Sequence, residues 1–298
     1  MPRPNRLLIL GAGLALLTAC GGAGDGSPAD GESGVTSQCM ADAVNAGRLT
    51  VGTSNPAFPP YVLLPEEGET ATEPWELGDP TKGRGFEAAV AYAIAEELGF
   101  ATDQVDWVVV PFENSYAPGE KDFDFTLQQI SYTAERAEVV DMSDGYFFVN
   151  QALVSQAGTD LAGATTIDEV RSAQLGVASG TTSLSYIQDV IQPDQEPMVY
   201  NDNDGAIAAL EAEQVDGIVV DVPTAFFITA VQMEDGVIVG QFPAAGDEEE
   251  YFSLVLEQDS PLTGCVNDAI SSLRESGELE DITQEWMSEN AGAPEIAP

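Results

Sequence analysis

The feature that most constrains the fold of this chain is a strand–helix–strand pattern in its first half. We expect a buried strand at Leu49–Thr53, a helix with apolar residues at every fourth position at Phe86–Leu98, and another strand at Val105–Pro111. Gly99 follows the helix and is a typical helix terminator. Strands joined through a helix are normally parallel neighbours in one sheet. The pattern therefore predicts an α/β fold.

A second unit of the same kind is expected further along the chain. Strands are predicted at Ala173–Val177 and Gly217–Asp221. Helices are predicted after Gly180, at Gly205–Glu213 and from Pro223. We interpret the repeated order of strands and helices as a second α/β unit.

The N-terminus has the layout of an export signal. Arg3 and Arg6 precede an apolar run at 7–17, which is too short to span a bilayer stably. The run ends in Leu-Thr-Ala before Cys20, which resembles the lipobox of bacterial lipoproteins, where the cysteine receives a diacylglyceryl group and becomes the first residue. We predict a lipoprotein signal peptide at 1–19 and lipid on Cys20. The alternative is a plain secretory leader with an incidental cysteine.

Two further cysteines remain once Cys20 carries lipid. Cys39 and Cys265 are then available as a pair in an oxidising compartment, and we predict a disulfide between them. The alternative is two buried free thiols. The pairing would join the two ends of the folded part of the chain.

The closing segments determine the predicted domain limits. A strand is expected at Tyr251–Leu256, followed by helices at Leu262–Glu275 and Leu279–Ser288. Because Cys265 lies in the first of these helices, the disulfide would place the C-terminal piece in the first lobe. The predicted organisation is a signal peptide at 1–19, a flexible tether of small and acidic residues at 20–38, lobe one at 39–147 plus 250–290, lobe two at 148–249, and a disordered tail at 291–298.

The charge balance excludes several classes of partner. The chain has 9 Lys and Arg residues against 51 Asp and Glu residues, which gives a formal net charge of −42. Nucleic acid and anionic lipid surfaces are therefore not expected partners. Most of the acidic residues, including the run Asp247 to Glu250, are expected to form a solvated surface. The absence of histidine from the sequence excludes an imidazole-based catalytic triad or metal site, and we expect no cofactor and no metal.

Several short motifs occur in a characteristic order along the chain. They are Val51-Gly52-Thr53 with Phe58-Pro59-Pro60-Tyr61, Gly85-Phe86-Glu87, Ile130 to Arg136 with Val140 to Ser143, Gly176 to Thr182, Asp216 to Pro223, and Val266 to Ile270. Their order and spacing, from Leu49 to Trp286, resemble the extracytoplasmic solute-binding proteins of amino-acid ABC importers, the family of the histidine-, glutamine- and lysine/arginine/ornithine-binding proteins. The resemblance implies a two-lobed periplasmic-binding-protein fold of type II, with parallel-dominated sheets, a two-strand hinge and one ligand between the lobes.

Arg136 is the candidate for holding the ligand carboxylate. A free amino acid is a zwitterion, so its site needs a cation for the carboxylate and an anion for the ammonium group. Arg136 stands three residues past Thr133, a good N-cap, and its planar guanidinium suits bidentate contact with a carboxylate. The alternative is a surface arginine paired with Glu135 or Glu138.

The second lobe is expected to complete the contacts to the ligand backbone. Thr181 and Thr182 lie at a predicted helix N-terminus, which favours an anion, and the resemblance places them near the carboxylate; an ordinary helix cap is the alternative. Asp221 ends an apolar strand at the edge where α/β sheets bind ligands, and we expect it to take the α-ammonium group. Its alternative role is to cap the helix from Pro223. Ser131 is expected to add a backbone or hydroxyl contact.

The pocket for the ligand side chain is expected to involve Phe58 and Phe112, which match aromatic positions of the family; the alternative is that both are core residues. Gln129, which we also expect to bind the ligand, stands where the family commonly has a small Ser or Thr. Ser54 or Asn55 replaces an acidic residue of the basic-amino-acid binders. These two departures favour a neutral or polar amino acid.

The predicted function is capture of an amino acid at the extracytoplasmic face of the cell membrane. A monomer, anchored only by lipid, would deliver its ligand to the transmembrane subunits of an ABC permease. We expect no enzymatic activity. The alternatives are a prephenate or arogenate dehydratase on the same fold and a ligand-binding sensor subunit, although the residue spacing singles out no additional acid in the cleft.

Overall fold

The computed structural model describes residues 38–246, 249–287 and 293–298. The predicted signal peptide, Cys20 and nearly all of the predicted tether lie outside the described residues. Within those three described ranges, no helix is both long enough and apolar enough to cross a bilayer.

The first lobe is built on a sheet of five strands in the order β2-β1-β3-β12-β4. The central β1 (Leu49–Thr53) pairs in parallel with β2 (Val105–Val109) and β3 (Phe125–Thr126). On the other side, β12 (Val255–Leu256) pairs antiparallel with β3 and β4 (Asp141–Met142). Since β12 comes from far along the chain, this lobe is discontinuous in sequence.

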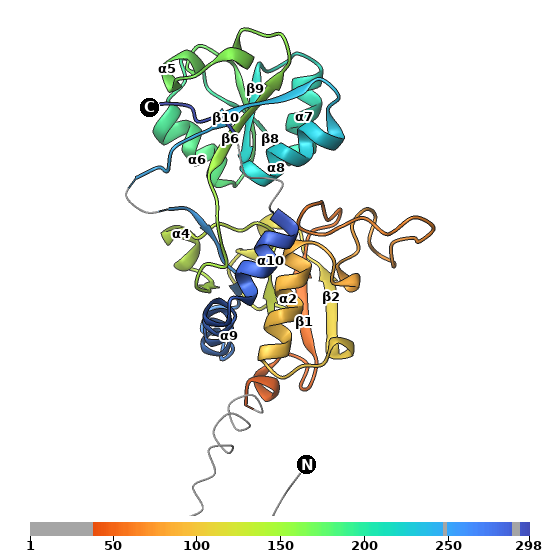
Figure 1. Cartoon of the computed structure of the whole chain (residues 1–298). Helices are drawn as coiled ribbons and strands as arrows, with labels where there is room; N and C mark the ends of the chain where they lie inside the picture. Colours follow the sequence, from red (N-terminus) through yellow and green to blue (C-terminus); the bar gives the residue numbers. More distant parts are fainter. Residues whose placement is uncertain (1–37, 247–248, 288–292) are drawn as a thin grey trace, which may run out of the picture.

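Three long helices cover the first sheet (Figure 1). α2 (Phe86–Glu97) packs against both α9 (Thr263–Ser276) and α10 (Glu278–Met287). Its apolar residues Phe86, Val90 and Ile94 are fully buried, as their spacing predicts. α9 ends at Gly277, whose φ of 87° is the left-handed conformation that favours glycine after a helix.

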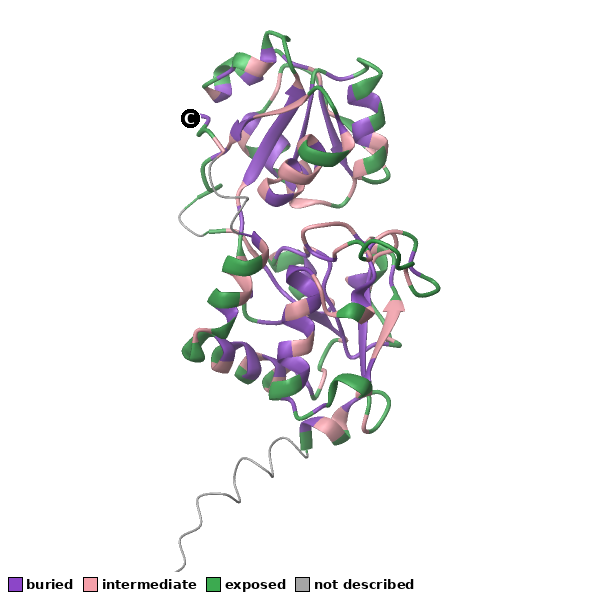
Figure 2. Ribbon diagram, turned by 45° about the vertical axis from the view of Figure 1, so that its right-hand side comes forward, coloured by how far each residue is buried: buried purple, intermediate pink, exposed green. Residues whose placement is uncertain are grey.

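The second lobe contains a sheet in the order β10-β6-β9-β7-β8. β6 (Gln151–Gln156) pairs antiparallel with β10 (Gly236–Gln241) and β9 (Gly217–Asp221). β7 (Leu175–Ala178) pairs in parallel with β9 and β8 (Met198–Tyr200). Each large sheet therefore combines parallel and antiparallel pairs. Figure 2 shows that buried residues line the centre of both lobes.

Shorter helices flank the two sheets. In the second lobe they are η3 (Leu161–Gly163), α5 (Ile167–Val170), α6 (Thr182–Tyr186) with its π-helical continuation η4 (Ile187–Ile191), α7 (Asn203–Glu211), and α8 (Val222–Phe227) with its π-helical continuation η5 (Ile228–Gln232). In the first lobe they are η1 (Pro80–Lys82), η2 (Thr102–Gln104), α3 (Phe112–Ser115) and α4 (Ala134–Ala137).

Two short strands form a separate hinge between the lobes. β5 (Phe147–Phe148) and β11 (Tyr251–Phe252) pair antiparallel, apart from both large sheets. The predicted single strand over 251–256 is therefore two strands. The chain breaks regular pairing at Ser253, whose amide donates to the carbonyl oxygen of Ile130, so that β11 belongs to the hinge and β12 to the first sheet.

The predicted disulfide is confirmed. Cys39 and Cys265 are bonded, with a Cα–Cα distance of 6.1 Å, so the alternative of two free thiols is wrong. The bond ties a short helical segment at 38–42 to α9. Both cysteines pack in the core of the first lobe.

The C-terminal residues differ from the prediction. Residues 293–298, which we call the C-terminal strap, were expected to be disordered but lie on the second lobe. The Gln241 amide donates to the carbonyl oxygen of Pro294 at 2.7 Å, and the Ile296 amide donates to that of Gln241 at 2.9 Å. Ile296 is buried in the second core. The outer edge of β10 offers unpaired backbone groups, and the strap satisfies them.

Candidate ligand-binding site

Arg136 lies in the interface between the two lobes. The hydroxyl oxygen of Thr133 caps α4 by accepting a hydrogen bond from the Arg136 amide at 3.1 Å. The guanidinium is buried: Nη1 donates to the carbonyl oxygen of Ser131 at 2.6 Å and Nη2 donates to that of Gly180 at 2.8 Å. Ser131 belongs to the first lobe and Gly180 to the second. The alternative of an exposed surface arginine is therefore wrong.

Two aromatic rings hold the Arg136 guanidinium from the first lobe. Its central carbon lies 4.5 Å from the ring centre of Tyr116 and 5.8 Å from that of Phe112. These two rings meet edge to face, with centres 5.5 Å apart, and the Tyr116 hydroxyl donates to the Gly180 carbonyl oxygen at 3.3 Å. Burial lowers the pKa of Arg136 from its usual value, but a guanidinium stays protonated at neutral pH. The structure thus orients a permanent cation between the lobes.

The two threonines of the second lobe have different roles. Thr181 is the N-cap of α6: its hydroxyl oxygen accepts from the Leu184 amide at 3.3 Å and donates to the Ala178 carbonyl oxygen at 2.9 Å. Thr182 instead faces the first lobe, where its hydroxyl group lies 3.4 Å from that of Ser131. The ordinary capping role therefore applies to Thr181, while Thr182 lies across the interface from Ser131.

Asp221 ends β9 and lies between the lobes. Its side chain makes no capping hydrogen bond to α8, so the alternative role as a helix cap is not observed. One carboxylate oxygen accepts from Gln151 Nε2 at 2.8 Å. Burial, with the nearby negative charge of Glu250, raises the pKa of Asp221 well above its usual range. An adjacent cation would restore the ionised form of this carboxyl group.

Glu250 and Gln151 also lie in this interface, although the sequence did not predict them. Gln151 Nε2 also donates to Glu250 Oε2 at 3.0 Å, while the other oxygen of Glu250 accepts from the Ser131 hydroxyl at 2.5 Å. The Ser183 hydroxyl donates to Gln151 Oε1 at 2.6 Å. This chain of hydrogen bonds joins both lobes to the residue that precedes β11. Glu250 was expected to be a solvated surface acid; the signal that could have identified it is its position directly before the hinge strand.

Gln129 points into the first lobe. Its backbone amide donates to Glu87 Oε1 at 2.7 Å, and its side-chain amide donates to the other oxygen of the same carboxyl group. The Tyr146 hydroxyl donates to Glu87 as well, at 2.5 Å. Burial raises the pKa of Glu87 to about 7. Gln129, which is larger than the Ser or Thr common in the family, therefore pairs with the buried Glu87 of α2.

The aromatic residues of the loop after β1 also reach the interface. Phe58 lies 5.9 Å, ring centre to ring centre, from Phe227 of α8. Tyr61 is buried, and among the described residues its hydroxyl group has no hydrogen-bond partner of normal geometry. Thr224 and the charge of Asp221 are close enough to influence its pKa, which burial raises well above its usual value. The structure thus leaves an unpartnered hydroxyl group near Asp221.

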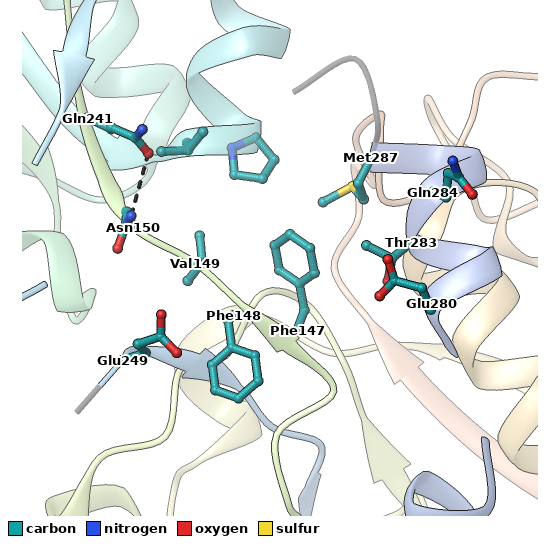
Figure 3. Close-up of a pocket in the computed structure, with 12 residues that line it drawn as sticks. Phe147, Phe148, Val149, Asn150, Gln241, Glu249, Glu280, Thr283, Gln284 and Met287 are labelled. Carbon is teal, nitrogen blue, oxygen red and sulfur yellow. Dashed lines mark hydrogen bonds between the residues drawn. The ribbon is translucent and has the colours of Figure 1, made fainter. Parts of the chain in front are cut away.

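Cavities lie on different sides of this interface. One of about 420 Å³ is bordered by Tyr132, Thr182 and Glu250, and another of about 550 Å³ by Tyr116 and Arg136. A third, of about 540 Å³, lies behind the hinge (Figure 3). Hinge residues and α10 line it, and none of the predicted ligand-binding residues does.

Comparison with known proteins places this architecture in a family. The model for bacterial extracellular solute-binding proteins, family 3, matches residues 49–289. The arginine-binding extracellular protein ArtP of Bacillus subtilis is 24% identical over 72% of this chain and 82% of its own length. The arginine-, lysine-, histidine-binding protein ArtJ of Geobacillus stearothermophilus has a similar structure, with a TM-score of 0.64 and 18% identity over 81% of this chain and 95% of its own.

A third similar structure is the ancestral amino-acid-binding protein AncCDT-1, described as a precursor of cyclohexadienyl dehydratase. It has a TM-score of 0.63 and 20% identity, over 80% of this chain and 95% of its own. These likenesses show the two-lobed type II fold that the sequence predicts. Because the family model matches nearly all of the folded part, this chain belongs to family 3 of the bacterial extracellular solute-binding proteins.

Proposed function

We propose that this chain is the lipid-anchored solute-binding component of an ABC importer, which captures an amino acid between its lobes and delivers it to the permease. The observation that carries the proposal is a buried arginine and a half-buried aspartate in one interface between two lobes. Arg136 is the cation, and Asp221 is the anion. A zwitterion supplies the complementary pair of charges, so that neither protein group is left buried without a partner.

The proposed orientation follows from the donors around the interface. The α-carboxylate binds Arg136, where it replaces the Gly180 carbonyl oxygen as the acceptor for Nη2 and meets the hydroxyl group of Thr182. The α-ammonium group binds Asp221 and the carbonyl or hydroxyl oxygen of Ser131. Each end of the ligand then contacts both lobes, so ligand binding favours the closed arrangement.

We propose a neutral or polar amino acid as the ligand. Phe58 lies against Phe227 of the second lobe, Phe112 lies beside the Arg136 guanidinium, and both rings are only partly buried, so they would border the ligand side chain. The acidic residue that basic-amino-acid binders carry after the first strand is absent here. Asn55 occupies that region and is held by the loop around Pro74, since its side chain donates to the Pro74 carbonyl oxygen at 2.9 Å.

Lipid on Cys20 would hold the binding protein at the outer face of the membrane. A tethered protein has a high effective concentration at its permease, which increases the rate of ligand delivery. Mass spectrometry of the protein extracted from membranes checks this part: a diacylglyceryl group on an N-terminal Cys20 supports it, and a mature chain that starts elsewhere contradicts it.

A dehydratase is the second candidate function, because Glu250 is an additional acid in the interface and AncCDT-1 is described as a precursor of such an enzyme. Incubation of the purified protein with prephenate or arogenate decides between the two. Formation of phenylpyruvate or phenylalanine would establish catalysis. Binding of free amino acids without turnover supports the transport function instead.

A thermal-shift screen over the common amino acids tests the proposed function directly. A ligand at about 100 times its dissociation constant stabilises the folded state by about 2.7 kcal/mol, which is a readily measured shift. Stabilisation by neutral or polar amino acids supports the proposed specificity. A screen in which no amino acid raises the melting temperature contradicts the proposed function.

A further inference from the structure

One short turn of the second lobe receives three hydrogen-bonded contacts from the first lobe. The turn consists of Ser179 and Gly180, which lie between β7 and α6. Arg136 Nη2 donates to the Gly180 carbonyl oxygen at 2.8 Å, and the Tyr116 hydroxyl donates to the same oxygen at 3.3 Å. The Ser179 hydroxyl donates to Glu113 Oε1 at 3.3 Å. We call these five residues the interlobe clamp, because each of the three contacts joins the two lobes.

Gly180 is suited to this contact because it has no side chain. Its φ of 69° lies in the left-handed region that favours glycine. A Cβ atom at this position would lie 2.6 Å from the Tyr116 hydroxyl oxygen. The turn can therefore approach Tyr116 and Arg136 this closely only with glycine at position 180.

The Arg136 guanidinium binds neutral acceptors in the clamp. One is the carbonyl oxygen of Ser131 in its own lobe, and the other is that of Gly180 in the second lobe. Among the described residues, the arginines that form ion pairs are Arg48, Arg84 and Arg171. A carboxylate accepts a charge-assisted hydrogen bond from a guanidinium, which is about twice as strong as a neutral one. A ligand carboxylate and the Gly180 carbonyl oxygen are thus alternative acceptors for one donor, Nη2.

We propose that the Gly180 carbonyl oxygen competes with the ligand carboxylate for Arg136, and that Tyr116 and Glu113 are positioning residues that hold this internal competitor in place. The inference rests on the proposed function, in which the carboxylate binds Arg136. Ligand binding then requires the clamp to release Gly180. The measured affinity is reduced in proportion to the fraction of molecules in which the clamp is formed.

The clamp affects the two rate constants of ligand binding differently. Its contacts to Gly180 exist before the carboxylate reaches Nη2 and are replaced when the carboxylate arrives. A weaker clamp therefore increases the fraction of molecules that can accept ligand, and with it the association rate constant. The dissociation rate constant stays nearly the same, because the clamp is already open in the bound protein.

The substitutions Tyr116→Phe and Ser179→Ala test the clamp without changing Arg136. Each removes one hydrogen bond between the lobes, and Tyr116→Phe keeps the aromatic ring against the guanidinium. Neither residue is fully buried, so both variants should fold. Since a hydrogen bond of this kind contributes modestly to stability, we expect each variant to bind L-glutamine about two- to tenfold more tightly. Calorimetry measures the affinity, and stopped-flow mixing shows whether the gain lies in the association rate.

Tyr92→Phe is the matched control. The Tyr92 hydroxyl donates to the Thr81 carbonyl oxygen at 3.2 Å, but both residues belong to the first lobe. The substitution removes the same kind of hydrogen bond without affecting the contact between the lobes. It should leave the affinity and both rate constants for L-glutamine unchanged. A gain in affinity is diagnostic, because loss of a merely structural hydrogen bond would not strengthen ligand binding.

Small-angle scattering without ligand provides a second measurement, which does not depend on the identity of the ligand. Tyr116→Phe and Ser179→Ala should have a larger radius of gyration than the unmodified protein and Tyr92→Phe, since the lobes separate more often. Equal radii for all four proteins would overturn the inference.

The outcomes separate this inference from the proposed function. If both clamp variants bind L-glutamine with unchanged or lower affinity, the competition by Gly180 is refuted, while amino-acid binding itself stands. If none of the four proteins binds any of the common amino acids, the proposed function fails, and the inference fails with it.

Discussion

At the scale of single residues, Arg136 is the side chain on which the proposed ligand contact depends most. We expect Arg136→Ala to weaken ligand binding by roughly 2 to 5 kcal/mol, because the ligand carboxylate would be buried without its cation. Isothermal calorimetry measures this loss. Arg171→Ala is a matched control, since Arg171 pairs with Asp168 on the exposed surface of the second lobe and should leave the affinity unchanged.

Replacement by phenylalanine should affect the free energy of unfolding differently at Tyr61 and at Tyr146. Tyr61→Phe removes a buried hydroxyl group that has no partner among the described residues, so the free energy of unfolding of the ligand-free protein should stay constant or rise by about 1 kcal/mol. Tyr146→Phe removes the donor to Glu87 and should lower it by about 1 to 3 kcal/mol. Urea unfolding distinguishes them. Equal destabilisation by both substitutions would contradict the assignment for Tyr61.

The raised pKa of Glu87 should make the stability of the folded protein depend on pH. Its pKa in the folded protein, about 7, lies above the usual 4.5, so the folded state binds a proton more tightly than the unfolded state. The resulting stability is fully present below about pH 4.5 and is lost as the pH rises through about 7. Glu87→Gln should therefore flatten the decline in melting temperature over this interval. A variant with the slope of the unmodified protein would show that Glu87 titrates normally.

The site residues differ in whether neighbouring residues in the sequence are enough to predict their positions in the structure. Thr133, Arg136 and Asp221 follow from short motifs, since an N-cap and a strand end are both recognised from adjacent residues. Glu250 depends on contacts with Ser131 and Gln151, which are 119 and 99 residues away in sequence. Local patterns carry no information about such a contact. An acidic run next to a strand is typical of a solvated surface, and that expectation concealed Glu250.

At the scale of elements, the helices were better predicted than the strands. α2, α9 and α10 begin and end close to the predicted limits. α9 and α10 are amphipathic, α2 has apolar residues at every fourth position, and Gly277 caps the end of α9. β6 was not predicted, although its Ala-Leu-Val core is fully buried, since a short apolar run has no distinctive period. The division of 251–256 between hinge and sheet depends on pairing partners that lie far away in sequence.

The disulfide provides a prediction for the first lobe. It connects residues 226 positions apart, so Cys265→Ser should lower the free energy of unfolding by roughly 2 to 5 kcal/mol, mainly because the unfolded chain gains freedom. Denaturant unfolding measures the loss. Dithiothreitol should destabilise the unmodified protein similarly and have no effect on the Cys39→Ser/Cys265→Ser double variant. A strong effect on the double variant would point to a different cause.

At the scale of the whole molecule, the C-terminal strap adds a third connection between lobes that were predicted to be joined by two. α10 belongs to the first lobe, whereas the strap pairs with β10 and with the loop before α5, where the Ala297 amide donates to the Thr165 carbonyl oxygen at 2.8 Å. Deletion of 293–298 should therefore widen the range of opening. We expect small-angle scattering to show a larger radius of gyration for the ligand-free variant and an unchanged one with saturating ligand.

A point substitution separates this effect from chain shortening. Ile296→Asp places a charge in the second core and should detach the strap, because Ile296 is 2% exposed. Glu295→Gln, at an exposed strap residue, is the matched control. If the deletion and Ile296→Asp both leave the ligand-free scattering unchanged, the strap does not restrict opening.

The position of the strap also bears on the direction in which the lobes move. The two hinge strands, β5 and β11, permit both bending and twisting of one lobe relative to the other. The strap is anchored at Gln241, which borders the same cavity as the hinge residues Phe147 and Phe148 (Figure 3). A third attachment beside the hinge would oppose torsion between the lobes. The two lobes would then open and close along one rotational path. Each closure would bring the same side chains of the two lobes back together.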